Sequence, residues 1–166
     1  MKLDIRAIRK SYGMSKNAFA SIMGIKELSY SEYETREELP SKYVYLLWKN
    51  LENFPIPDDF FYYTSFVLET NMSYHHMTQT EVAKMFDIAN QSTISGYLKS
   101  NIPMYEKKEY FLKFDPFIVP VILQKDENEF KKTEITELIA KGNFILVEKR
   151  RLQKIRKTEE RLKNAE

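Results

Sequence analysis

The sequence predicts a mainly helical α+β fold, in which two helix-turn-helix units form an internal pseudo-dimer beside a small antiparallel β-hairpin and a C-terminal helix. An apolar pattern occurs twice in roughly the first 100 residues, and after Pro103 short apolar runs replace the helical spacing. The 166 residues suffice for one domain or two small ones. We expect three segments: residues 1–57, residues 58–103, and residues 104–166 packed on the first two.

The repeat relates residues 3–33 to residues 66–97. Apolar or small side chains recur under a shift of 63 positions, and under a shift of 64 after one inserted residue. The matched pairs include Phe19 with Val82, Ala20 with Ala83, Ile25 with Ile88, Tyr30 with Ile94, and Tyr33 with Tyr97. We interpret the two segments as related units.

The residue pattern of each unit predicts short helices joined by tight turns. Ser15 and Thr78 are residue types that cap helix N-termini, and each precedes an apolar stripe at helical spacing. Gly24 ends the first of these helices with a residue that tolerates left-handed backbone, and Asp87 holds the same place in the second copy. A further helix then turns one apolar residue inward. This order of helix, turn and helix is a helix-turn-helix.

The other elements are expected from local pattern. Residues 41–54 predict an apolar helix between Pro40 and Pro55. Residues 60–68 have strand propensity, but the repeat favours a helix that starts at about Asp59.

The last segment is expected to contain both strands and helices. Residues 109–114 and 117–123 predict a β-hairpin, with Pro120 pushing one strand to an edge. Residues 131–140 predict a short helix, and residues 145–164 a longer, mostly polar one.

Composition argues against several classes of function. The chain has no Cys, only two His (His75 and His76) and four Gly, so it lacks parts for disulfides, thiol chemistry, a multi-His metal centre or a glycine-rich phosphate loop. No apolar run reaches the ~20 residues of a membrane span, and the N-terminus lacks a signal-peptide stretch. We expect a cytoplasmic protein that is no enzyme and takes no cofactor, metal or membrane.

The net charge of +2 is unevenly distributed. Residues 147–166 carry eight Lys and Arg against four Glu. A second basic group lies near the N-terminus: Lys2, Arg6, Arg9, Lys10, Lys16 and Lys26. A local basic excess suits a polyanion partner, and it also suits a solvated helix face.

Residues 78–99 (TQTEVAKMFDIANQSTISGYLK) resemble the helix-turn-helix of Cro/CI-type repressors, above all in Thr78-Gln79, Ala83 and residues 91–95. Residues 15–34 (SKNAFASIMGIKELSYSEYE) are similar in a shared framework, which comprises Ala20, Gly24, Ile25, Tyr30 and Tyr33. The resemblance implies that the third helix of each unit lies in the major groove of DNA, and that the N-terminus of the second helix meets the backbone. In arrangement and size the chain is also similar to the small TraN-type accessory DNA-binding proteins of Gram-positive conjugative-transfer operons.

The second copy carries the more persuasive candidates. Amide and hydroxyl side chains gather at the start of its expected third helix: Asn90, Gln91, Ser92, Thr93 and Ser95. Gln and Asn pair with adenine through two hydrogen bonds, and Ser and Thr reach phosphates or base edges. The expected phosphate contacts are Thr78, Gln79, Lys84 and Lys99. The same polar residues also fit an exposed helix that is only solvated.

The first copy departs from this pattern. Its expected third helix carries Glu27, Glu32 and Glu34, which repel phosphate, and Leu28 where a small polar residue is expected. The candidate contacts are Lys16, Asn17, Lys26, Glu27 and Ser29, with Glu27 accepting from a cytosine amino group and Lys2, Arg6, Arg9 and Lys10 as backbone partners. Alternatively, this unit is a packing module that does not read DNA.

Together these observations predict a monomer with an internal pseudo-two-fold that binds double-stranded DNA sequence-specifically. It would act as a transcriptional repressor or as an accessory, relaxosome-type factor of a conjugative plasmid transfer system, with a relaxase or other transfer proteins as partners. Two binding units would match half-sites about one helical turn apart. The alternative is a protein-interaction scaffold of a transfer or secretion complex with degenerate helix-turn-helix units.

Overall fold

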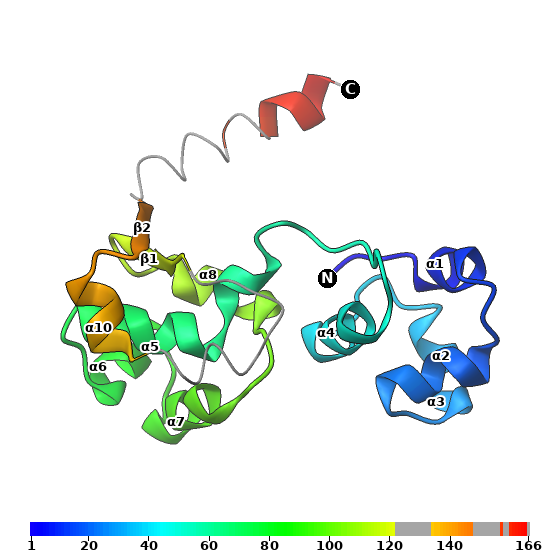
Figure 1. The fold of residues 1–166 in the computed structure, drawn as a ribbon, viewed down its shortest axis with the longest axis horizontal. Helices are drawn as coiled ribbons and strands as arrows, with labels where there is room; N and C mark the ends of the chain where they lie inside the picture. Colours follow the sequence, from blue (N-terminus) through cyan, green and yellow to red (C-terminus); the bar gives the residue numbers. More distant parts are fainter. Residues whose placement is uncertain (122–133, 148–156, 158–159, 166) are drawn as a thin grey trace.

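The computed structural model describes residues 1–121, 134–147, 157 and 160–165 (Figure 1). The part of the chain that it describes is mainly helical and contains one small antiparallel sheet of two strands. The predicted α+β class is therefore confirmed. Within the described residues no helix is both long and apolar enough to cross a membrane.

The first group of helices comprises α1 (Ile5–Ser11), α2 (Lys16–Met23), α3 (Glu27–Tyr33) and α4 (Ser41–Asn50). Ser15 caps α2 as predicted, since its Oγ accepts from the Ala18 N–H at 3.1 Å. Gly24 ends α2 in the left-handed region, with φ +69°, so that α3 can turn back onto α2. The predicted helix over residues 41–54 stops at Asn50, because Leu51 adopts extended backbone.

A hydrophobic core holds these helices together. Phe19 and Ala20 of α2, Tyr30 of α3 and Leu47 of α4 are all fully buried in it. The rings of Phe19 and Tyr30 meet edge to face, with centroids 5.5 Å apart. The predicted inward residues of the first copy are confirmed.

The second group comprises η1 (Phe60–Tyr63, a 3-10 helix), α5 (Ser65–Tyr74), α6 (Gln79–Met85) and α7 (Gln91–Lys99). The helix predicted from Asp59 onward is interrupted, because Thr64 has extended backbone and caps α5 by accepting from the Val67 N–H. Thr78 caps α6 as predicted, and Asp87 occupies the left-handed region with φ +55° in the place that Gly24 holds in the first group.

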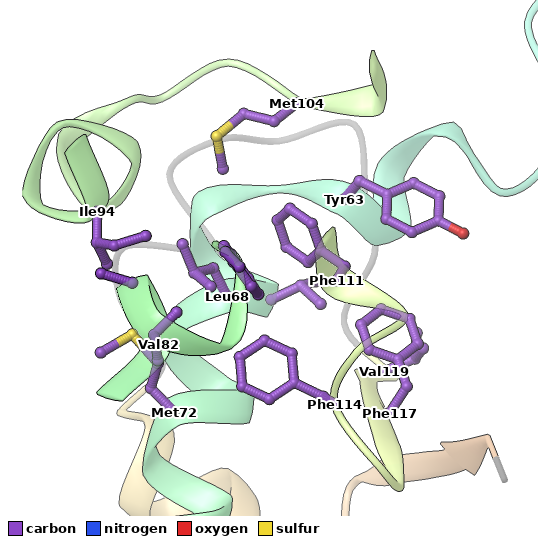
Figure 2. Close-up of a cluster of buried hydrophobic side chains, with 13 residues drawn as sticks. Tyr63, Leu68, Met72, Val82, Ile94, Met104, Phe111, Phe114, Phe117 and Val119 are labelled. Carbon is purple, nitrogen blue, oxygen red and sulfur yellow. The ribbon is translucent and has the colours of Figure 1, made fainter. Parts of the chain in front are cut away.

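A second core lies among α5, α6, α7 and the segment that follows them (Figure 2). Leu68 of α5, Val82 of α6, Ile94 of α7 and Phe111 converge there and are buried. Ala83 is 4% exposed, and its counterpart Ala20 is fully buried in the first core. The starts of α6 and α7 thus follow those of α2 and α3 at the shifts of 63 and 64 residues that the sequence predicts.

Contacts join the two groups at the N-terminal end of α4 and around Tyr105. The Ser41 hydroxyl donates to the Pro103 carbonyl at 2.8 Å, and both residues are buried. Tyr105 stacks on Phe60 and also meets Tyr63 edge to face, so it contributes to both cores.

The predicted hairpin of residues 109–114 and 117–123 is wrong. Residues 105–111 are helical, as η2 (Tyr105–Lys107) and α8 (Lys108–Phe111), and β1 (Phe117–Pro120) pairs instead with β2 (Phe144–Val147). Phe111 and Phe114 are three residues apart and both buried, which suits a helical turn, whereas strand alternation would place them on opposite faces.

The structure also corrects the start of the predicted C-terminal helix. The segment from Phe144 to Val147 is a strand because its residues pair with β1, while residues 160–165 are helical and residues 148–156 lie outside the described part. Of the helix predicted over residues 131–140, the described portion is α10 (Ile135–Ala140), and residues 131–133 lie outside the description.

Candidate nucleic-acid interface

We call the exposed side of α7, together with the N-terminal end of α6 and Lys84 in its last turn, the α7 surface. Its members are the nine residues that were predicted from the second copy: Thr78, Gln79, Lys84, Asn90, Gln91, Ser92, Thr93, Ser95 and Lys99. All are exposed or half-buried, and none lies in the core. Ile94 of α7 is fully buried, so the opposite face of the helix, which carries Ser92, points outward, while Gln91 is exposed at the first residue of the helix.

The side chain of Gln91 is held in place by two neighbours from α6. The Thr80 hydroxyl donates to Gln91 Oε1 at 3.3 Å, and Gln91 Nε2 donates to Gln79 Oε1 at 3.4 Å. An amide nitrogen has two donor hydrogens and an amide oxygen two lone pairs, so Gln91 keeps one donor and one acceptor for a partner. The α6 residues therefore orient an amide that remains able to form two hydrogen bonds. Thr80 was not among the residues predicted from the sequence, where its place two residues after the cap Thr78 was the only signal for it.

Two of the predicted contacts are already occupied as helix caps. Thr78 and Glu81 form a capping box: Thr78 Oγ1 accepts from the Glu81 N–H, and Glu81 Oε2 accepts from the Thr78 N–H at 2.7 Å. Hydrogen bonds from the Thr78 backbone and hydroxyl lower the pKa of the Glu81 carboxyl. Asn90 Oδ1 accepts from the Ser92 N–H at 2.9 Å and so caps α7. The side-chain oxygens of Thr78 and Asn90 therefore already accept hydrogen bonds within the protein and stabilise the starts of α6 and α7.

The cations beside the α7 surface differ in their surroundings. Lys84 and Lys99 are exposed, on α6 and at the end of α7. Lys113 instead lies 3.6 Å from a carboxylate oxygen of Asp87. Lys84 and Lys99 are therefore the two described cations best placed to meet a polyanion at this surface.

The corresponding face of the first group is the α3 surface: the outward side of α3 with Asn17 of α2 and Lys26 before α3. Asn17, Lys26, Glu27, Leu28 and Ser29 are all exposed, as the sequence predicts for contact residues. Lys16 is the exception, because its Nζ lies 3.7 Å from Glu34 Oε2 and 3.4 Å from the Ser31 hydroxyl.

Glu34 lies in a partly buried ion pair and does not face outward. Arg9 Nε donates to Glu34 Oε1 at 2.9 Å, and Arg9 Nη1 donates to the Met14 carbonyl. The side chains of Arg9 and Glu34 are only 12% and 7% exposed. Burial alone would raise the pKa of the Glu34 carboxyl, but the Arg9 hydrogen bond and the charges of Arg9 and Lys16 outweigh it and lower this pKa. Arg9 was expected to contact the DNA backbone, and the structure uses it inside the protein instead.

The Tyr30 hydroxyl is buried beside this ion pair. Burial, together with the nearby Glu34 carboxylate, raises the pKa of Tyr30 far above its ordinary value. Arg9 of α1 and Lys16 of α2 are therefore both paired with Glu34, the residue that follows α3.

Among the described residues no group of three His, Asp or Glu side chains converges as metal ligands would. His75, one of the two histidines, has its Nε2 2.7 Å from the Pro116 carbonyl oxygen and its ring stacked on Phe114. Comparisons of the chain with protein-family models, with curated proteins and with solved structures find no match in any of the three.

Proposed function

We propose that this protein binds double-stranded DNA, with α7 lying in the major groove. One observation carries the proposal: the amide of Gln91 stands on the exposed side of α7, is oriented by Gln79 and Thr80, and keeps a donor and an acceptor available. In the major groove the N6 amino group of adenine donates and N7 accepts, which complements the free acceptor and donor of the Gln91 amide. An oriented amide loses little side-chain freedom when it binds, which favours base reading over nonspecific solvation.

The neighbouring residues extend this reading surface. Ser92 is exposed and Ser95 half-exposed on the same helix, and hydroxyl groups bond to either phosphates or base edges. Lys84 and Lys99 would neutralise phosphates on the two sides of the groove, which supplies affinity that does not depend on sequence. In this mechanism, charge brings the duplex to the surface and the amide then selects the site.

The matching arrangement of the two groups of helices supports the proposal that one chain contains a pair of helix-turn-helix units. The two groups of helices follow the same order, and α2 packs on α3 as α6 packs on α7. A monomer of this kind would act as a transcriptional repressor, or as an accessory factor that marks a transfer origin for a relaxase. Both roles rest on the resemblance to known families.

A binding experiment with the full chain tests the proposal. A library of random duplexes is incubated with the protein at low ionic strength, bound duplexes are recovered and sequenced, and affinities are then measured by fluorescence anisotropy over a range of salt concentrations. We expect enrichment of a defined site and a steep loss of affinity with salt, since each neutralised phosphate releases counterions. No binding to any duplex at low salt would reject DNA binding and favour the scaffold alternative.

A further inference from the structure

The α3 surface presents different chemistry from the α7 surface at matching positions. The shift of 64 residues places Glu27 on Gln91 and Leu28 on Ser92. Leu28 is 81% exposed, the highest exposure among the large hydrophobic residues that the structure describes. The second residue of α3 thus presents an exposed apolar side chain where the second residue of α7 presents a hydroxyl.

The ion pairs of the first group involve Glu32 and Glu34, while Glu27 and the exposed Glu37 and Glu38 stand outside the ion pairs between described residues. Glu34 is neutralised by Arg9 and is 7% exposed. The Glu32 carboxylate lies 3.7 Å from the Arg36 guanidinium. None of the ion pairs between described residues involves Glu27. The one α3 carboxylate left outside these pairs therefore stands at the tip of the helix, next to Leu28.

We propose that α3 reads a second DNA half-site that differs from the one read by α7, with Leu28 contacting the C5-methyl group of a thymine. This inference rests on the proposed function. Apolar side chains recognise the thymine methyl in the major groove, and a carboxylate accepts from the N4 amino group of cytosine. Glu27 and Leu28 thus fit neighbouring cytosine and thymine bases, whereas Gln91 fits adenine.

The surroundings of Leu28 favour a base over a protein partner. Its exposed neighbours Lys26, Glu27 and Ser29 are charged or polar, so the leucine stands alone and forms no apolar patch. A single methyl-sized contact is what one thymine offers, while a protein interface requires a larger apolar centre. Lys26 would meet the phosphates beside this base.

A consequence follows for the form of the target. Two identical units, as in a symmetric dimer, read two identical half-sites. Because α3 and α7 carry different side chains on one chain, the target is not palindromic, and each molecule lies on it in one orientation only. The two ends of a bound molecule would then be distinguishable to any protein that assembles beside it.

Thymine-to-uracil substitution tests the contact directly. Uracil pairs with adenine as thymine does and lacks only the C5-methyl group. In the duplex selected by the full chain, each thymine is replaced by uracil in turn, and affinities are measured for the wild-type protein, for Leu28→Ala and for the control Leu162→Ala, which truncates another exposed leucine. We expect one uracil in the α3 half-site to weaken wild-type binding about fourfold, as the loss of one buried methyl group would.

The variants separate the possible outcomes. Leu28→Ala should bind the thymine and uracil duplexes equally, while Leu162→Ala should keep the fourfold difference. The proposal is overturned if the selected site is a palindrome, or if it contains only one half-site. It is also overturned if Leu28→Ala still distinguishes thymine from uracil. In these three cases the duplex is still bound, so DNA binding by α7 stands. Failure to select any duplex would reject the proposed function itself.

Discussion

The side chain of Asn71 bonds to the backbone of Ile118 as a neighbouring β-strand would. Asn71 Nδ2 donates to the Ile118 carbonyl at 2.9 Å, and the Ile118 N–H donates to Asn71 Oδ1 at 2.8 Å. The same Nδ2 donates to Val67 O within α5, and Asn71 is fully buried. Strand β1 is therefore held by β2 on one side and by a single asparagine of α5 on the other.

Replacing Asn71 should destabilise the protein. In Asn71→Ala the N–H and the carbonyl of buried Ile118 lose their partners, which we expect to lower the free energy of unfolding by about 2–4 kcal/mol. Urea denaturation followed by circular dichroism measures the change. Asn50→Ala is the control, because the Asn50 amide also donates to a carbonyl four residues earlier but is exposed. Equal effects of the two variants would show that β1 does not depend on Asn71.

The ion pair of Arg9 and Glu34 should make stability depend on pH. The pKa of the Glu34 carboxyl is lower in the folded protein than its ordinary value of 4.5, so the folded state binds the proton less readily than the unfolded state does. The stabilisation is complete above pH 4.5 and is lost as the pH falls through the folded-state pKa. Glu34→Gln should reduce stability at pH 7 and flatten this acid limb.

Denaturant titrations at several pH values between 7 and 3 measure the effect of Glu34→Gln. The matched control is Glu32→Gln, whose carboxylate is exposed and lies 3.7 Å from Arg36. Exposed pairs contribute little, so the control should retain the wild-type pH profile. An unchanged profile in Glu34→Gln would contradict the role assigned to this pair.

Removing the Gln91 amide should affect sequence selection more than general affinity. Gln91→Ala should lose about 1–3 kcal/mol on the selected duplex and little on an unrelated one, because the amide reads a base and not a phosphate. Fluorescence anisotropy with both duplexes measures the difference. Asn50→Ala removes an exposed amide of α4, a helix that belongs to neither surface, and should bind as the wild type does. A uniform loss on all duplexes would show that Gln91 is not a base reader.

The two lysines of the α7 surface should affect the salt dependence instead. Lys84→Ala and Lys99→Ala should each reduce the slope of log Kobs against log salt by about 0.9, the value for one phosphate contact. Lys141→Ala is the control, since Lys141 pairs with Glu137 on α10. If the slope is the same in all three variants, Lys84 and Lys99 do not contact phosphate.

The sequence by itself was sufficient to predict α2, α3, α6 and α7 and the turns between them. Ser15 and Thr78 mark helix starts because a side-chain oxygen at that place satisfies a free backbone N–H of the first turn. Gly24 and Asp87 mark helix ends because they adopt the left-handed backbone needed there. These preferences are local, and they can be read without knowledge of distant residues. The same holds for the exposed position of Ser92, which lies on the face of α7 opposite the buried Ile94.

Only the tertiary structure decided which segments pair and which charges face outward. Strand β1 pairs with β2 across 23 intervening residues, and no local signal distinguishes that partner from the nearer residues 109–114. Glu34 counts as an acidic surface residue in the sequence, yet the fold brings Arg9 of α1 to it and withdraws both charges from the surface. Strand pairing and ion pairing depend on the distance between groups in space, and that distance is fixed only when the helices pack.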